Sequence, residues 1–188
     1  MKKIFLALSL FISFSVLAQE KLKPAIKQGS KLKYTAHTGE NDVPVIITLD
    51  SITPAYAKIG WTIEGYGTGA WVMKAKSLET ATRGYWNDPA VGNEDVLADE
   101  QIMLLFSRAQ WNSIQKDKKA DYDMQTFTVK EPTEAQQFKL DGKAVDCIML
   151  EGQNGSTRVW VLNNASLPLI LRIEGNTMGP SITLQELQ

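Results

Sequence analysis

The stretch QFKLDGKAVDCIMLEGQNGSTRVWVL, residues 137–162, holds three short runs typical of β-strands with two turn signals between them. The runs, at 137–140, 144–150 and 158–162, are rich in apolar and β-branched residues. Asp141-Gly142 is a preferred pair for a two-residue hairpin, and Asn154-Gly155 marks a second, slightly longer one. Because short hairpins make neighbouring strands antiparallel, this stretch predicts a meander.

Further runs of the same kind occupy much of the remaining chain, with glycine, proline and asparagine between them. We expect strands at 32–36, 43–49, 57–63, 70–76, 122–129, 169–173 and 182–187. They predict a mainly β fold of the α+β class: a curved antiparallel sheet or a partly open β-barrel. We expect it to form a single domain over residues 29–188.

One long central helix is expected to interrupt the strands. Asparagine and acidic residues at 93–100 precede an apolar run, which is typical of a helix amino terminus. We therefore predict a helix from Val96 or Asp99 to Lys116. With about 100° between successive residues, its apolar side chains form two stripes. The first contains Ile102, Leu105, Phe106 and Ala109, and the second contains Met103, Leu104, Trp111 and Ile114.

A helix that lies on a sheet buries only one apolar stripe. The second stripe must then be covered by the preceding segment 78–91, by another chain or by a ligand. The two-faced helix is therefore the feature of the sequence that most favours a binding function.

The amino terminus has the plan of a secretory signal peptide. Lys2 and Lys3 are followed by a mostly apolar run to residue 17 and then by Ala18. The run is shorter than the roughly 20 residues needed to cross a bilayer. We expect residues 1–18 to be removed by cleavage after Ala18. Residues 19–28 are polar and are expected to form a flexible lead-in. The mature chain is expected in the periplasm or outer envelope, without a transmembrane segment.

The charge of the chain argues against two classes of partner. It has 20 basic and 21 acidic residues, and loss of Lys2 and Lys3 leaves 18 basic against 21 acidic, a net charge of −3. Binding to nucleic acid or to an anionic membrane surface normally requires an excess of positive charge. Neither is expected as a partner.

The inventory of reactive side chains argues against catalysis. The single histidine, His37, is expected in a surface turn, so no other histidine is left to build a Ser-His-Asp set. With Cys147 as the single cysteine, a metal cluster of histidine and cysteine is excluded as well. Cys147 lies in an apolar run and is expected to be an inert, buried thiol. A two-carboxylate mechanism would have to use Asp121 and Asp123, which one continuous strand would place together on its solvent face. We expect no catalytic residue, no metal and no cofactor.

Large apolar side chains remain as candidates for binding. Five tryptophans and several methionines are spread over both halves of the chain, and they suit either an ordinary core or an adaptable apolar pocket. The candidate ligand-binding residues are Trp71, Met103, Leu104, Trp111 and Ile114.

Two stretches of the chain resemble the ends of exported bacterial β-rich domains of unknown function. One is GSKLKY at 29–34 with the strand that follows it. The other combines VWVLNN at 159–164, LPLILRIEG at 167–175 and ITL at 182–184. This resemblance implies a β-rich envelope protein and no particular reaction. More distantly, the layout resembles periplasmic lipoprotein carriers, in which an incomplete barrel holds acyl chains beneath a helical lid.

Together these observations predict a non-enzymatic, exported envelope protein that binds or carries a lipid-like or other apolar ligand. The alternative is a structural or assembly protein that docks on another envelope protein through the second helix face or an edge strand.

Overall fold

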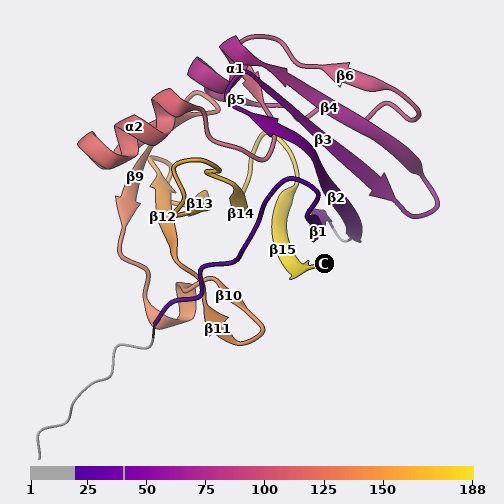
Figure 1. Cartoon of the computed structure of the whole chain (residues 1–188). Coiled ribbons are helices and arrows are strands. Elements are labelled where there is room, and N and C mark those ends of the chain that lie inside the picture. The colour runs from indigo at the N-terminus through magenta and orange to yellow at the C-terminus, as the bar shows by residue number, and fades with distance from the viewer. Residues whose placement is uncertain (1–19, 40) are drawn as a thin grey trace, which may run out of the picture.

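The computed structural model describes residues 20–39 and 41–188, and one large β-sheet dominates it (Figure 1). The predicted signal peptide and its cleavage site lie outside these residues. The main strands are β1 (Lys31–Thr38), β2 (Asn41–Thr53), β3 (Tyr56–Ile63), β4 (Gly67–Lys74), β8 (Lys119–Tyr122), β9 (Gln125–Lys130), β12 (Cys147–Gly152), β13 (Arg158–Leu162), β14 (Ile170–Glu174) and β15 (Ser181–Leu187). The shorter elements are α1 (Ala75–Thr80), β5 (Arg83–Gly84), β6 (Glu94–Val96), β7 (Gln101–Ile102), α2 (Arg108–Asp117), η1 (Glu134–Gln136), β10 (Lys139–Leu140) and β11 (Lys143–Ala144).

The large sheet has eleven strands in the order β6-β4-β3-β2-β1-β15-β14-β13-β12-β9-β8. It begins and ends on different strands, so it is not a closed barrel. The prediction of a mainly β fold is confirmed, and the sheet curves as Figure 1 shows. The prediction of an entirely antiparallel sheet is wrong at one edge, because β6 pairs with β4 in parallel.

The first and last strands lie side by side in the middle of this order. Leu32 of β1 pairs with Leu187 of β15, and His37 pairs with Ser181. The meander β1 to β4 therefore extends to one side of this junction, and the strands of the second half extend to the other. Helix α1 contacts β3 and β4, while α2 contacts α1 and β8, so the segment from α1 to α2 connects the two ends of the sheet (Figure 1).

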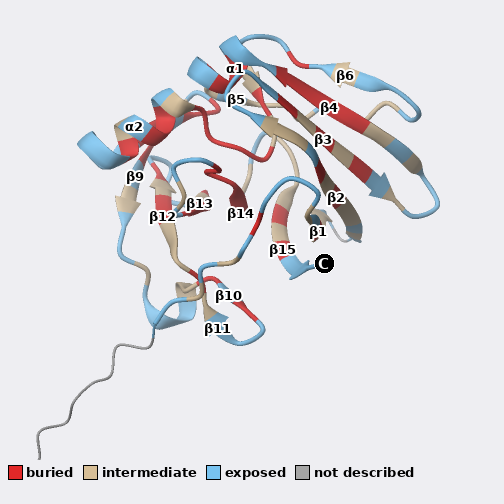
Figure 2. Ribbon diagram, viewed as in Figure 1, coloured by how far each residue is buried: buried red, intermediate tan, exposed pale blue. Residues whose placement is uncertain are grey.

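Burial alternates along several strands, as expected for a sheet with one face toward the core (Figure 2). On β3, for example, Ala57, Ile59 and Trp61 are buried. Strand β13 is buried on both faces, because Val159 and Trp160 are each 0 % exposed. The Trp160 indole N–H donates to the carbonyl oxygen of Gln136 at 2.9 Å, so the loop that contains η1 covers this face. Trp160 is therefore part of the core.

The central helix is shorter than predicted and begins later. It starts at Arg108, where Ser107 and Gln110 form a capping box in which each side chain accepts a hydrogen bond from the backbone N–H of the other. Most of the preceding run is extended: β7 pairs with β5, and Leu105 forms a bridge with Leu169. The predicted two-faced helix is therefore wrong, because the apolar residues at 102–106 are buried outside any helix and α2 begins only at Arg108.

The strand predicted at 122–129 is in fact a hairpin of two strands, β8 and β9. Asp123 and Met124 form its turn with positive φ angles of 47° and 61°, the conformation of a type I′ turn. Met124 is 75 % exposed, whereas one continuous strand with Asp121 and Asp123 on its solvent face would have placed Met124 on the inner face.

Residues 20–28, predicted as a flexible lead-in, lie against the rest of the protein. The Leu22 backbone N–H donates to the carbonyl oxygen of Ala144 at 2.7 Å, and Leu22 forms a bridge with Val145. Ile26 is buried. Backbone hydrogen bonds and an apolar contact thus attach this segment to the second half of the chain.

Candidate functional site

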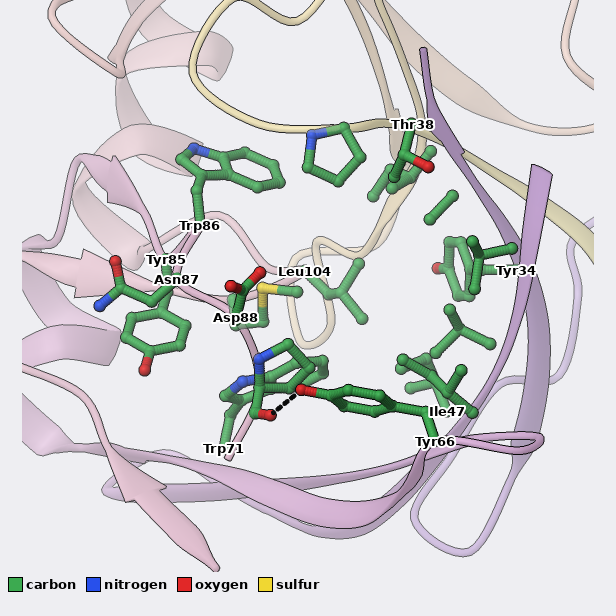
Figure 3. A pocket seen from close by; sticks show the side chains of 18 residues that line it. Tyr34, Thr38, Ile47, Tyr66, Trp71, Tyr85, Trp86, Asn87, Asp88 and Leu104 are labelled. Atoms are coloured by element: carbon green, nitrogen blue, oxygen red, sulfur yellow. Dashed lines mark hydrogen bonds between the residues drawn. The ribbon is translucent and has the colours of Figure 1, made fainter. Parts of the chain in front are cut away.

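A cavity of about 570 Å³ lies between the β1 to β4 part of the sheet and the loops that follow β5 and β7 (Figure 3). We call it the large cavity. Its wall consists mainly of aliphatic and aromatic side chains. The lining residues are Tyr34, Ala36, Thr38, Val43, Val45, Ile47, Ile63, Tyr66, Trp71, Tyr85, Trp86, Asn87, Asp88, Pro89, Met103, Leu104, Pro180 and Ile182.

The alternation of strand side chains builds the apolar part of this wall. Tyr34 and Ala36 of β1 line the cavity and pair across the sheet with Val45 and Val43 of β2, which line it too. Ile46, which lies between the lining residues Val45 and Ile47, falls on the opposite face because successive strand side chains point in opposite directions. A run of alternating residues on two adjacent strands therefore gives one continuous apolar surface.

The segment Tyr85–Pro89, which we call the rim segment, forms another part of the wall (Figure 3). It is held at one end by Asp123, whose carboxylate accepts the Gly84 backbone N–H at 2.7 Å and the Trp86 indole N–H at 2.8 Å. At its other end the Tyr66 hydroxyl donates to the Pro89 carbonyl oxygen at 3.1 Å, the dashed line in Figure 3.

The Trp86 indole also lies against the backbone of Gly179. A Cβ atom at Gly179 would come within 2.6 Å of the indole ring, so no larger residue fits there without displacing the ring. The absence of a side chain at Gly179 therefore helps to position Trp86 at the cavity.

Polar groups are few in the buried part of the wall. The Tyr34 hydroxyl donates to the Ile170 carbonyl oxygen at 2.8 Å, and burial raises the pKa of Tyr34 well above its usual value. The Trp71 indole nitrogen is buried without a hydrogen-bond partner in the described part of the protein. Among the 18 described lining residues, Asp88 is the only one with a charged side chain, and it is exposed at the rim.

Three of the five predicted ligand-binding residues, Trp71, Met103 and Leu104, line the large cavity. Trp71 comes from β4, and Met103 and Leu104 come from the bend that follows β7. Trp111 and Ile114 are buried on α2 and are not among the lining residues. The structure thus separates Met103 and Leu104 from Trp111 and Ile114, although the predicted helix had placed all four on one stripe.

A second cavity, of about 420 Å³, lies near the amino terminus of α2. Leu105 and Phe106 line it, whereas the preceding Met103 and Leu104 line the large cavity. Arg108 also lines the second cavity and donates to the Pro54 carbonyl oxygen at 2.6 Å. The segment 103–106 therefore contributes to both cavities.

The two carboxylates considered for catalysis have different surroundings. Asp121 is exposed and accepts from the Thr126 hydroxyl at 2.7 Å. Asp123 is buried in the β8–β9 turn and holds the rim segment. The prediction that both acids share the solvent face of one strand is wrong, because the turn at Asp123 ends β8.

Other reactive groups lie apart from one another. His37 contacts Asp42 through Nδ1 at 2.6 Å on the partly exposed β1–β2 hairpin. Cys147 is partly exposed, and desolvation raises the pKa of its thiol to about 12. Across residues 20–39 and 41–188, no three histidine, cysteine, aspartate or glutamate side chains are grouped closely enough to hold a metal ion.

Sequence reasoning missed the rim segment and Tyr66 as parts of the site. The available signal was Tyr85-Trp86 followed by Asn-Asp-Pro, because two adjacent aromatic residues in a segment without periodicity have no strand or helix face to occupy. The segment 78–91 was one of three candidates to cover a helix face, beside another chain and a ligand, and its central residues border the large cavity.

Comparisons of the chain with protein-family models, curated proteins and solved structures each found no match. Within the described part of the chain, no helix has the length and apolar character required to span a bilayer.

Proposed function

We propose that this chain is a non-enzymatic binding or carrier module of the bacterial envelope and that it holds a lipid-like or other apolar ligand in the large cavity. The observation that carries this proposal is the cavity itself, about 570 Å³ in volume and lined mainly by apolar side chains. Pockets of roughly 300–1,000 Å³ with apolar walls and a few polar groups are typical of small-molecule sites.

The volume suits one acyl chain. A methylene group occupies about 30 Å³, close to the liquid volume of a water molecule, so a volume of about 570 Å³ corresponds to a chain of about 19 carbon atoms. Each buried methylene contributes about 0.8 kcal/mol. A twelve-carbon chain therefore gains about 10 kcal/mol before the costs of ordering and association are subtracted.

The rim segment gives such a ligand a route in and out. Asn87 and Asp88 are exposed, and the Tyr66 hydrogen bond to Pro89 is exposed as well. An exposed hydrogen bond contributes little because water replaces it readily. The expectation that the chain is exported rests on its amino-terminal sequence. Export would place this site where envelope lipids are available.

The alternative, a structural or assembly protein that docks on another envelope protein, has less support. The second helix face on which it depended does not exist, because Met103 and Leu104 precede the helix. The end strands β6 and β8 are short and carry charged residues such as Glu94 and Asp121, features that discourage strand addition.

Native mass spectrometry of protein purified gently from its own envelope tests the proposal, followed by extraction of any co-purifying lipid. Val45→Trp places a large side chain in the cavity, and Ile46→Trp places the same side chain on the opposite face of β2 as the matched control. We expect an apolar adduct on wild type and Ile46→Trp and its loss from Val45→Trp. Repeated preparations without adduct, together with no saturable binding of the apolar dye N-phenyl-1-naphthylamine, would contradict the proposal.

A further inference from the structure

We propose that the large cavity selects a cationic amphiphile, an acyl chain that carries an ammonium head group at the rim segment. This inference rests on the proposed function and adds the chemical class of the ligand. Three independent features support it: the charge of the rim, its aromatic side chains and a buried donor without a partner.

The one charged side chain among the described lining residues is a carboxylate, that of Asp88. It belongs to the acidic segment 84–107, which lies between Arg83 and Arg108 and contains five carboxylates, Asp88, Glu94, Asp95, Asp99 and Glu100. Glu94 is paired with Lys58 at 2.5 Å, but Asp88 has no basic residue beside it among the described lining residues. A ligand with a carboxylate or phosphate head would therefore meet repulsion at Asp88, whereas an ammonium would be attracted.

Aromatic rings accompany Asp88 at this part of the wall. Tyr85 and Trp86 belong to the rim segment, while Trp71 and Tyr66 come from β4 and the β3–β4 turn. In Figure 3 Tyr85, Trp86 and Trp71 lie on the same side of the cavity as Asp88. The faces of such rings attract cations, and aromatic sites of this kind bind quaternary ammonium groups.

The Trp71 indole explains why we propose an acyl chain and not a simple alkyl chain. Trp71 is 5 % exposed, its nitrogen has no partner in the described part of the protein, and its ring lines the cavity. A buried N–H without an acceptor is costly. A carbonyl oxygen between head group and tail would supply that acceptor.

Three probes with the same twelve-carbon acyl group separate the effect of the head: lauroylcholine, monolauroylglycerol and laurate, each titrated below its micelle concentration. Binding is measured calorimetrically at pH 7 in low salt. We expect lauroylcholine to bind at least tenfold more tightly than laurate, because the cation gains both the Asp88 and the aromatic contributions. The difference should shrink as salt is added.

Asp88→Asn tests the role of the carboxylate, and Asp99→Asn removes one charge from the same acidic segment outside the lining. Relative to monolauroylglycerol, lauroylcholine should lose about two- to fivefold in affinity in Asp88→Asn and keep its affinity in Asp99→Asn. Equal losses in both variants would mean that net charge alone attracts the cation, and would overturn the inference.

The acyl carbonyl has a separate test. Lauroylcholine should bind wild type more tightly than dodecyltrimethylammonium, and Trp71→Phe should abolish that advantage. An equal affinity of wild type for both probes would refute the carbonyl contact.

The outcomes distinguish the two proposals. If all three twelve-carbon acyl probes bind with equal affinity, the cavity is an apolar site and the choice of head group is wrong. If none binds, the proposed function itself fails.

Discussion

Replacement of Trp160 by alanine is expected to destabilise the protein strongly. The side chain is fully buried, and its neighbours across the sheet are Met149 on β12 and Arg172 on β14. The Arg172 guanidinium lies 4.8 Å from the indole ring centroid. Trp160→Ala removes this packed ring and leaves a cavity, which typically costs about 3–5 kcal/mol. It also removes the donor to Gln136, and an unpaired carbonyl adds about 1 kcal/mol if water cannot reach it.

A loss of this size is a large part of the 5–15 kcal/mol that stabilises a typical domain. For a protein of about this length, 1 kcal/mol corresponds to about 2–4 °C in Tm, so Trp160→Ala should lower Tm by about 6–20 °C. Differential scanning calorimetry and urea denaturation give Tm and the free energy of unfolding. Trp160→Phe should cost less than Trp160→Ala, because it keeps an aromatic ring and loses the indole N–H.

Met124→Ala is the control, because Met124 is 75 % exposed and its truncation should change the free energy of unfolding by less than about 0.5 kcal/mol. If Trp160→Ala melts within one or two degrees of wild type, the assignment of Trp160 to the core is refuted.

Three further predictions concern the rim segment, a tight turn and the response to alkaline pH. Asp123→Asn replaces one acceptor oxygen with an amino group, so it should lower the free energy of unfolding by about 1–3 kcal/mol. It should also make Trp86 more accessible to acrylamide quenching, measured as the difference from a Trp86→Phe background. Unchanged quenching would contradict the role of Asp123. Gly155→Ala and Gly175→Ala both place alanine at positive φ, but only Gly175→Ala brings the new Cβ against a backbone carbonyl oxygen. In urea melts we expect the free energy of unfolding to fall by about 1–2 kcal/mol in Gly155→Ala and by clearly more in Gly175→Ala. Equal losses in the two variants would argue against the clash. Partial burial raises the pKa of Cys147 to about 12 from 9.0, so as pH rises the thiol ionises first in the unfolded chain. Its contribution to stability is therefore complete below about pH 9 and is lost toward pH 12. Cys147→Ala should lose stability less steeply than wild type from pH 9 to 11, and identical slopes would refute this.

The sequence was most informative where a strand pattern and a turn signal agreed. The strand predicted at 158–162 has the observed bounds, and Asp141-Gly142 forms the expected hairpin between β10 and β11. The hairpin at Asp123-Met124 was missed because neither residue is glycine or asparagine, the usual residues for positive φ. Its conformation is supported by the contacts of Asp123 with Gly84 and Trp86, which lie far away in the sequence.

The helix boundary was missed for a related reason. An apolar run after acidic residues fits a helix equally well as an extended segment that is buried on several sides, and periodicity alone does not separate them. The local signal that marks the true start, Ser107 with Gln110 three residues later, was present in the sequence. The acidic residues at 93–100 lie in β6 and in the turn before β7, and they do not cap a helix.

The candidate site could be predicted only in part. Trp71, Met103 and Leu104 were predicted as ligand-binding residues, and they line the same cavity. Their grouping depends on β4 and the segment after β7 approaching each other across the fold, which a local pattern does not encode. The rim segment has no regular structure of its own, so its position depends on partners such as Asp123 and Tyr66.

The pairing of β1 with β15 has a consequence for how the chain reaches its fold. Tyr34 and Leu184 are partners in this pairing although 150 positions separate them (184 − 34). During synthesis from the amino terminus, β1 lacks its partner until nearly every residue has been added, and during that time one of its edges remains unpaired. Closing so long a loop lowers the conformational entropy of the chain before the β1–β15 contacts stabilise the fold. The central β1–β15 pairing is therefore the last pairing of the sheet that can form. Until it forms, the free edge of β1 is open to pairing with other strands.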